Sequence, residues 1–333
     1  MKHVLLSVVV PTYNRCALLA RTLPALLTHA HRAGGTEVIV VVDGSKDQTV
    51  EMLRGHREER RLRIVVQENR GLAAARNRGA GVASSEVVLF LDDDMILRKG
   101  ALEAHLAAHA DRKERVAFGA LNLAEGPRRS FLKMGVEIWG KEMAERLSSP
   151  GHRFRFDDCH FGHASISLPL FRRAGGFDES FVRFGNEDYD LGFRLIQMGA
   201  EMRFLAGASA CQTYDKGLYR WLRDCACVGM ADRALAQKHP TLAGELRFAN
   251  LPPHPLRRLA RLSGLAAVDP LGPAWGVMEA ALASLEMLGA RGSLLGKAQT
   301  LLGERRYWKG IRLAGTPARP PLTAGEPERG RVA

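Results

Sequence analysis

Short apolar runs alternate with helix-like segments through the first half of the chain. The runs at 5–10, 37–42, 63–67 and 87–91 consist mostly of Val, Ile and Leu, with few polar residues to mark a solvent-facing side. Strands that are apolar on both faces and separated by helices are typical of parallel sheets that helices cover on both sides. The sequence therefore predicts an α/β fold built on a mostly parallel sheet.

Polar residues follow three of these strands, at the point where each strand ends. They stand at 11–13 (Pro-Thr-Tyr), 43–45 (Asp-Gly-Ser) and 92–94 (three aspartates). Ligands of parallel sheets bind at the carboxyl ends of the strands, so we expect the three clusters to meet at one edge. The segment 11–15 lacks the Gly-x-Gly-x-x-Gly turn of a dinucleotide-binding dehydrogenase, which excludes that class.

The three aspartates supply the ligands that a hard divalent cation needs. Mg²⁺ and Mn²⁺ prefer carboxylate oxygens and accept phosphates and water as further ligands. Because neighbouring side chains along a strand point to opposite sides, we expect about two of the three to reach an ion. The alternative is a cluster that caps the next helix or is hydrated in a loop. Like charges gathered at the end of a buried strand repel one another unless a cation lies between them, which favours a metal site over the alternative.

The pattern changes after residue 216. Residues 218–239 have a helical pattern that ends at Pro240, residues 251–255 are rich in proline, and more helix is expected to about residue 312. The tail from 316 has the Pro, Gly, Glu and Arg content of a disordered segment. We expect an α/β domain at 1–215, a helical region at 216–315 and a disordered tail at 316–333. The stretch 126–150 is expected to be a mobile or partly helical insertion.

The net charge of the chain is +12 over 333 residues. This excess favours anionic partners, although a hydrated basic surface also explains it. No basic motif interleaved with aromatic residues is present, so we expect no nucleic-acid partner. Arg257, Arg258 and Arg261 stand between leucines, a pattern that fits contact with an anionic membrane. Packing of this helix on the α/β domain is the favoured alternative.

No apolar run in the sequence is suited to a signal peptide or a membrane span. We therefore expect a cytoplasmic protein, and a peripheral contact at the inner face of the membrane stays open. The five cysteines are odd in number and irregular in spacing, which predicts reduced thiols rather than a disulfide framework.

Six short motifs occur in series between residues 5 and 215. They are Ser-Val-Val-Val-Pro-Thr-Tyr-Asn-Arg at 7–15, Val-Val-Val-Asp-Gly-Ser-Lys-Asp at 40–47, Asn-Arg-Gly-Leu-Ala-Ala-Ala-Arg-Asn-Arg-Gly at 69–79, Phe-Leu-Asp-Asp-Asp at 90–94, Gly-Gly-Phe-Asp-Glu at 175–179 and Gly-Asn-Glu-Asp-Tyr-Asp-Leu-Gly-Phe-Arg at 185–194. In this order and spacing the chain resembles the family 2 glycosyltransferases of the GT-A fold. The resemblance implies a Rossmann-like, mostly parallel sheet of GT-A type with helices on both faces, a nucleotide-sugar-binding domain at 1–215 and a C-terminal helical region.

The resemblance assigns the first motifs to the nucleotide. Pro11, Thr12, Tyr13 and Arg15 would bind the donor, and Asp43 would hydrogen-bond its base, typically uracil. A carboxylate can accept a hydrogen from a ring N–H, and an aromatic ring can stack on a base. An Asx turn with the following glycine is the alternative for the aspartate.

The later motifs would complete the donor site. Gly71 would let the backbone approach the nucleotide, and the guanidinium of Arg76 suits phosphate or base oxygens, with helix-surface charge as the alternative. Asp93 and Asp94 align with the metal-binding pair of the family, and Asp92 would support the donor. The implied cofactor is Mg²⁺ or Mn²⁺.

Glu187 and Asp188 match an acidic pair that the family places near the acceptor. In an inverting displacement, one carboxylate takes the proton of the acceptor hydroxyl as it attacks. Asp188 is the expected base. A helix cap or a partner of the helix dipole is the alternative for such a pair.

Three departures from the family pattern bear on function. Val42 stands where many members have a further aspartate, and Gln212 or Tyr214 would have to replace a histidine that usually follows the strand at 201–205. The Gln-x-x-Arg-Trp motif of processive synthases is missing. We therefore expect a metal-dependent, inverting, non-processive hexosyltransferase that uses a UDP-sugar and a glycan, lipid-linked or natural-product acceptor. A degenerate member that binds a nucleotide or glycan without catalysis is the alternative.

Overall fold

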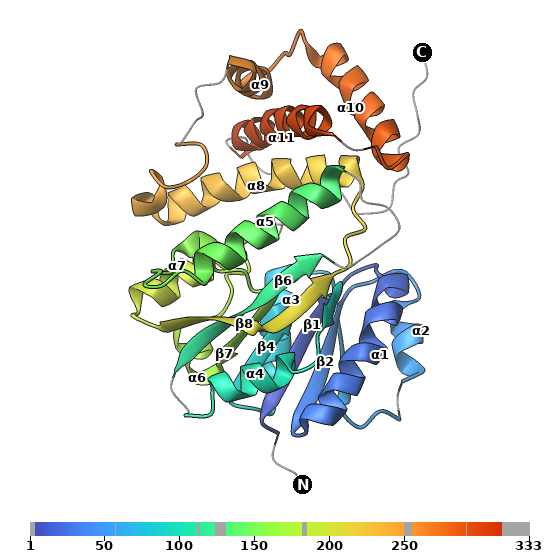
Figure 1. The fold of residues 1–333 in the computed structure, drawn as a ribbon, viewed down its shortest axis with the longest axis vertical. Coiled ribbons are helices and arrows are strands. Elements are labelled where there is room, and N and C mark those ends of the chain that lie inside the picture. The colour runs from blue at the N-terminus through green and yellow to red at the C-terminus, as the bar shows by residue number, and fades with distance from the viewer. Residues whose placement is uncertain are drawn as a thin grey trace.

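The sheet of the computed structural model has eight strands in the order β3-β2-β1-β4-β7-β6-β8-β5 (Figure 1). The structure describes residues 4–56, 58–111, 114–123, 131–181, 185–249, 255–290 and 292–314. The strands are β1 (Leu6–Thr12), β2 (Thr36–Asp43), β3 (Leu62–Gln67), β4 (Val87–Leu91), β5 (Met95–Leu97), β6 (Arg115–Leu123), β7 (His163–Ser167) and β8 (Glu201–Gln212). Strands β1 to β4 pair in parallel, as do β6 and β8, whereas β7 runs antiparallel to β4 and β6, and β5 to β8.

Helices cover both faces of this sheet because its central strands are apolar on both sides. Every residue of β1 and β2 is buried. Val9 and Ile39 belong to one core cluster, and Val8 and Val40 belong to the other. The helices around the sheet are α1 (Cys16–Ala33), α2 (Thr49–Arg54), α3 (Leu72–Gly81), α4 (Ala101–Ala108), α6 (Leu168–Arg173) and α7 (Glu187–Gln197). Residues of α3, α6 and α7 pack in the first cluster, and residues of α1, α2 and α4 in the second.

A group of helices stacks above the carboxyl ends of the parallel strands (Figure 1). It consists of α8 (Leu218–Lys238), α9 (Pro255–Leu265), α10 (Gly272–Met287) and α11 (Ser293–Leu313), which we call the helical cap. Helix α5 (Phe131–Leu147) lies between the cap and the sheet, and its Phe131 and Leu132 share a cluster with Leu222 and Trp275 of the cap. Two short 3-10 helices, η1 (Phe156–Asp158) and η2 (Pro240–Leu242), complete the described elements.

The predicted fold class is confirmed, with differences in detail. β4 has the predicted bounds, and β8 was expected to end at residue 205 but continues to Gln212 past an irregularity opposite Gly119 and Ala120. The stretch 126–150 contains the 17-residue helix α5, and the three-residue strand β5 was not predicted. The predicted tail at 316–333 lies outside the described residues. Within the described part, no helix has the length and apolar content needed to cross a membrane.

Candidate active site

A cleft of about 580 Å³ opens at the carboxyl ends of β1, β2 and β4. It brings together every residue that the sequence predicted for catalysis, donor binding or metal binding: Pro11, Thr12, Tyr13, Arg15, Asp43, Gly71, Arg76, Asp92, Asp93, Asp94, Glu187 and Asp188. Helix α5 and the segment that leads into α8 form the opposite wall through Trp139, Met143 and Lys216. The motifs that are distant in sequence therefore line one site between the sheet and the cap.

Asp43 ties the end of β2 to the loop that precedes α3. Its Oδ1 accepts hydrogen bonds from Gln67 Nε2 at 2.8 Å and from the backbone N–H of Arg70 at 2.9 Å, and its Oδ2 accepts one from the backbone N–H of Gly71 at 2.9 Å. A Cβ on the neighbouring Gly44 would lie 2.5 Å from the Asn69 nitrogen, so only glycine allows this approach. The carboxylate is thereby fixed at the wall of the cleft.

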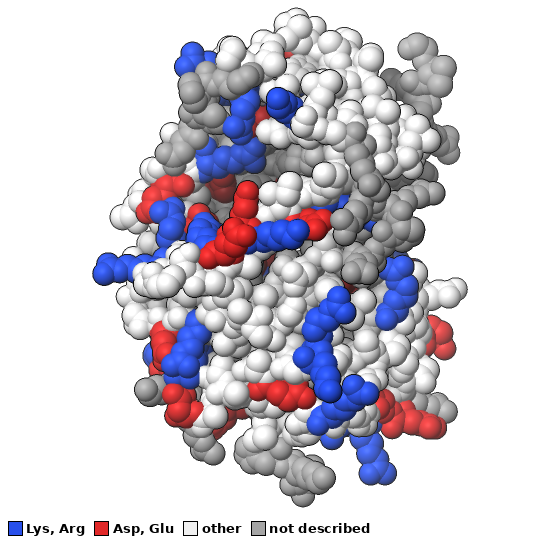
Figure 2. All heavy atoms as spheres, viewed as in Figure 1, with Lys and Arg blue, Asp and Glu red and all other residues white. Residues whose placement is uncertain are grey.

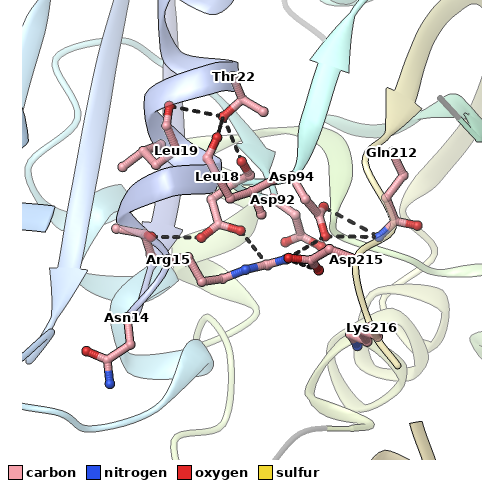
Figure 3. A network of polar contacts seen from close by, with 12 residues as sticks. Asn14, Arg15, Leu18, Leu19, Thr22, Asp92, Asp94, Gln212, Asp215 and Lys216 are labelled. Carbon is pink, nitrogen blue, oxygen red and sulfur yellow. Dashed lines mark hydrogen bonds and ion pairs between the residues drawn. The ribbon is translucent and has the colours of Figure 1, made fainter. Parts of the chain in front are cut away.

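Arg15 lies in the middle of the strand-end aspartates (Figure 3). Its Nη1 donates to Asp93 Oδ1 at 2.6 Å, and its Nη2 donates to Asp94 Oδ2 at 3.2 Å and to Asp215 Oδ1 at 3.3 Å. The Thr12 hydroxyl donates to Asp93 Oδ2 at 2.7 Å. Both oxygens of Asp93 therefore already have protein partners.

Asp94 has longer contacts with its protein partners than Asp93 has, and it lies near a second carboxylate. Burial and the negative charge of nearby Asp92 raise the pKa of Asp94. The Nε2 of Gln212 lies 3.4 Å from each oxygen of the Asp94 carboxylate. Tyr214 instead packs against the hydrophobic cluster of the cap. Of the two residues that could stand in for the family histidine, Gln212 is therefore the one beside the aspartates.

The oxygen atoms at this strand end fit a hard divalent cation. No three His, Cys, Asp or Glu side chains in the described part of the chain already converge as a preformed metal site would. Mg²⁺, however, is commonly held by one or two carboxylates together with substrate phosphates. Asp92 and Asp94 supply two such carboxylates, and a cation between them would relieve the repulsion that raises the pKa of Asp94.

Arg76 is the centre of a second acidic cluster and is 1% exposed. Its Nη2 donates to Asp92 Oδ1 at 3.0 Å, and its Nη1 donates to Glu187 Oε1 at 3.1 Å and Asp188 Oδ1 at 2.8 Å. Burial alone would lower the pKa of Arg76, but the charges of Asp188, Asp92 and Glu187 raise it. The guanidinium thus connects Asp92, which follows β4, with Glu187 and Asp188 at the start of α7, a link that the sequence did not reveal.

Asp188 is the more accessible member of the acidic pair at the start of α7. Its side chain is 17% exposed against 7% for Glu187. Asp188 Oδ2 accepts a hydrogen bond from the backbone N–H of Phe161 at 2.9 Å, which fixes its orientation. Burial and the charge of Asp188 raise the pKa of Glu187. Both carboxylates line the cleft, and that of Asp188 is the more exposed.

The helical cap holds the residue that precedes this pair. Asn186 has a left-handed backbone with φ of 66° and begins α7. Its Nδ2 donates to Asp232 Oδ1 of α8 at 2.6 Å, and the Tyr307 hydroxyl of α11 donates to Asp232 Oδ2 at 2.6 Å. A chain of buried hydrogen bonds therefore connects two cap helices to the acidic pair.

Several residues at the cleft were not singled out from the sequence. Trp139 of α5 is 40% exposed, and its ring meets that of His160 edge-on at 5.0 Å. His163 also lines the cleft, and burial lowers its pKa to about 4. Arg220 of α8 lies at the same wall. These residues come from segments without a repeated pattern. The one signal in the sequence was Trp139 itself, because the chain has four tryptophans.

Comparisons with known proteins agree with this geometry. The family described as "Glycosyl transferase family 2" matches residues 7–171. Validoxylamine A glucosyltransferase of Streptomyces hygroscopicus subsp. jinggangensis is 33% identical over 274 residues, which cover 74% of this chain and 63% of that protein. The chain thus spans less than two thirds of the length of this relative.

Two solved structures share the fold. The mannosyltransferase PcManGT from Pyrobaculum calidifontis, in complex with GDP-Man and Mn²⁺, superposes with a TM-score of 0.59 at 20% identity, over 92% of this chain and 86% of that one. TarS 1-349 from S. aureus, in complex with UDP-GlcNAc, gives a TM-score of 0.50 at 17% identity, over 93% of this chain and 92% of that one.

The curled sheet with acidic residues at its strand ends and helices on both faces is that of a GT-A glycosyltransferase domain. By this domain the chain belongs to glycosyltransferase family 2.

Proposed function

We propose that the protein is an inverting, non-processive glycosyltransferase that transfers a hexose from a nucleotide-diphosphate sugar, with UDP as the nucleotide, to an acceptor hydroxyl. One observation carries the proposal: Arg76 joins the donor-side carboxylate Asp92 to the acceptor-side carboxylate Asp188 within a single cleft. A donor and an acceptor can therefore meet between two acidic groups that stay fixed relative to each other.

On the donor side, Tyr13 and Asp43 would bind the nucleotide base, and Asp94 with Asp92 would hold Mg²⁺ or Mn²⁺. We favour Asp92 over Asp93 as the second ligand, because Thr12 and Arg15 bind the oxygens of Asp93 at 2.7 and 2.6 Å, whereas the partners of Asp94 lie at 3.2 to 3.4 Å. A bound divalent cation would offset the negative charge that develops on the leaving diphosphate. The guanidinium of Arg15 would add a further positive charge beside the leaving diphosphate.

On the acceptor side, Asp188 would take the proton of the attacking hydroxyl. Each of its oxygens accepts one hydrogen bond, from Arg76 or from the Phe161 N–H, so a lone pair stays free for that proton. Attack from the Asp188 side, opposite the diphosphate, would invert the anomeric centre. Trp139 and Met143 would form the apolar wall against which the acceptor lies.

The match to a named glucosyltransferase at 33% identity supports hexosyl transfer. The test is a panel of UDP- and GDP-sugars with Mn²⁺, scored for release of the nucleoside diphosphate. We expect release from one donor class, its loss on chelation, and an approximately 10²–10⁴-fold lower rate in Asp188→Asn, the usual contribution of a general base. Asp157→Asn is the matched control, because this aspartate lies in η1 and pairs with Arg155.

Metal binding is tested separately from turnover. Mn²⁺ should raise the melting temperature of the wild type and of Asp157→Asn but not of Asp94→Asn, because a ligand that binds only the folded state stabilises it. Chelation-resistant activity would remove the metal from the mechanism. Donor binding without release, for every sugar tested, would instead support a non-catalytic binding protein.

A further inference from the structure

Helix α10 has its charged residues turned inward and its apolar residues turned outward. Glu279 is 6% exposed, and its carboxylate pairs with Arg306 at 2.5 Å and with Arg305 at 3.6 Å inside the cap. Glu286 is half-buried on the same side of the helix. These two are the charged residues of α10, so its outer side carries none. In a cap helix of a soluble domain, the opposite distribution is usual.

The outer side of α10 presents a continuous apolar stripe. Ala274, Val277, Ala281, Leu285 and Leu288 are all exposed, with Val277 at 71% and Leu288 at 83%. They are spaced by three or four residues, which places them on one face of the helix. Figure 2 shows the surface over α10 almost entirely in white, whereas charged groups gather around the sheet and along the other cap helices.

The apolar surface continues beyond this helix. Val268 and Leu271, which precede α10, are 85% and 40% exposed, and Leu294 at the start of α11 is 76% exposed. Leu259 and Leu262 of α9 are 42% and 66% exposed. Exposed apolar side chains in such number on neighbouring elements indicate a surface that another apolar phase or molecule covers.

The charges around this surface identify its partner. In 255–290 and 292–314 every Asp and Glu is at least partly buried, whereas Arg258 and Lys297 are exposed. Of the other arginines of α9, Arg257 donates to Glu304 at 2.9 Å and Arg261 lies 4.6 Å from the centre of the Trp308 ring. A second copy of this surface would offer the exposed cations no counter-charge, whereas an anionic lipid surface would.

We propose that the outer face of α10 docks the protein on an anionic lipid bilayer, with the helix lying in the plane of the interface. The apolar stripe would enter the region between headgroups and acyl chains, and the exposed cations would meet the lipid phosphates. Unlike an isolated amphipathic helix, α10 is packed in the cap and its Glu279 is paired there with Arg305 and Arg306, so the docking surface is formed before the membrane is reached.

The test is co-sedimentation with vesicles of phosphatidylcholine alone or with phosphatidylglycerol. We expect the wild type to bind the anionic vesicles, less at high salt, and at least tenfold more than Val277→Glu/Leu288→Glu. Both substituted positions are strongly exposed, so the fold should survive. The control is Leu5→Glu/Met198→Glu, which adds the same charge at exposed positions of the sheet domain and should leave vesicle binding unchanged.

Oligomeric state, measured by light scattering, separates a lipid surface from a second copy. A wild type that does not bind anionic vesicles, or a double variant that binds them as well, overturns the proposal. A wild type that forms a dimer, and that Val277→Glu/Leu288→Glu converts to a monomer, also overturns the proposal, because the outer face of α10 would then be a protein interface. Neither result depends on donor turnover, so the proposed enzyme activity is tested independently.

Discussion

At the scale of single residues, Trp139 is a large side chain that faces the cleft while 40% of its surface stays open. Its ring meets that of His160 edge-on, and His160 and Asp188 line the same cleft. Aromatic faces supply much contact area with little loss of conformational freedom, which suits an acceptor of rings or chains. We expect Trp139→Ala to raise the acceptor KM about tenfold, the effect of ~1.4 kcal/mol of lost contact, with little change in donor KM.

The neighbouring Ile138 provides the matched control. It is 53% exposed on the same helix but does not line the cleft, so Ile138→Ala should leave both constants near their wild-type values. Equal effects of the two substitutions would mean that α5 contributes through packing alone. A larger change in donor KM than in acceptor KM would move Trp139 to the donor side.

At the scale of elements, glycines set the distance between α8 and α11. A Cβ on Gly229 would lie 2.1 Å from the Tyr307 carbonyl oxygen, and one on Gly310 would lie 2.0 Å from the Ala226 carbonyl oxygen. Backbone atoms cannot yield as a flexible side chain does, so Gly310→Ala should lower the free energy of unfolding by about 1–3 kcal/mol or more. Urea denaturation measures the change.

Gly276 of α10 is the control for helix propensity. Nothing lies within 4 Å of a Cβ at this position, so Gly276→Ala should be neutral or stabilise the protein by up to ~1 kcal/mol. If Gly310→Ala behaved in the same way, the contact between α8 and α11 would be looser than the structure shows.

The same scale shows how far the sequence could predict the fold. The strands β1, β2 and β4 were predictable because they are apolar at nearly every position and end at polar clusters. β5 has three residues, too few for any periodic pattern. The antiparallel direction of β7 depends on pairing with β4 and β6, which local residue preferences do not encode.

The candidate site, too, was predictable from the sequence only in part. The strand ends predicted from the sequence placed Asp43 and Asp94 at one edge of the sheet, and the family resemblance implied a place for Asp188 near the acceptor. The ion pairs of Arg76 and the position of Trp139 depend on how distant segments pack, so they needed the structure. Short motifs report the residues that end strands and begin helices, but they do not report what those residues contact.

At the scale of the whole molecule, a buried hydrogen bond joins the cap to Asn186, the residue that precedes the acidic pair. Tyr307 and Asp232 lie in the cap, and Asp232 holds Asn186 at the start of the helix that carries Asp188. The cap therefore has two surfaces of interest: its inner side is hydrogen-bonded to the residue that begins the helix of Asp188, the proposed base, and the outer face of α10 is the proposed membrane contact. The domain boundary predicted at residue 215 separates Asn186 from Asp232 and Tyr307, which these hydrogen bonds join.

Tyr307→Phe tests whether the cap positions the acidic pair at the start of α7. The substitution keeps the ring but removes the hydrogen bond to buried Asp232 Oδ2, which should cost about 1–3 kcal/mol of stability. If the proposed activity holds, kcat should fall more than donor KM rises, because Asp232, the partner of Asn186, is no longer held by the Tyr307 hydroxyl. Tyr219→Phe, on the exposed side of α8, is the matched control and should change neither. A loss of stability with unchanged kcat would limit the cap to folding, whereas a fall in kcat at a temperature where the variant is fully folded would show that the C-terminal helices act on the active site.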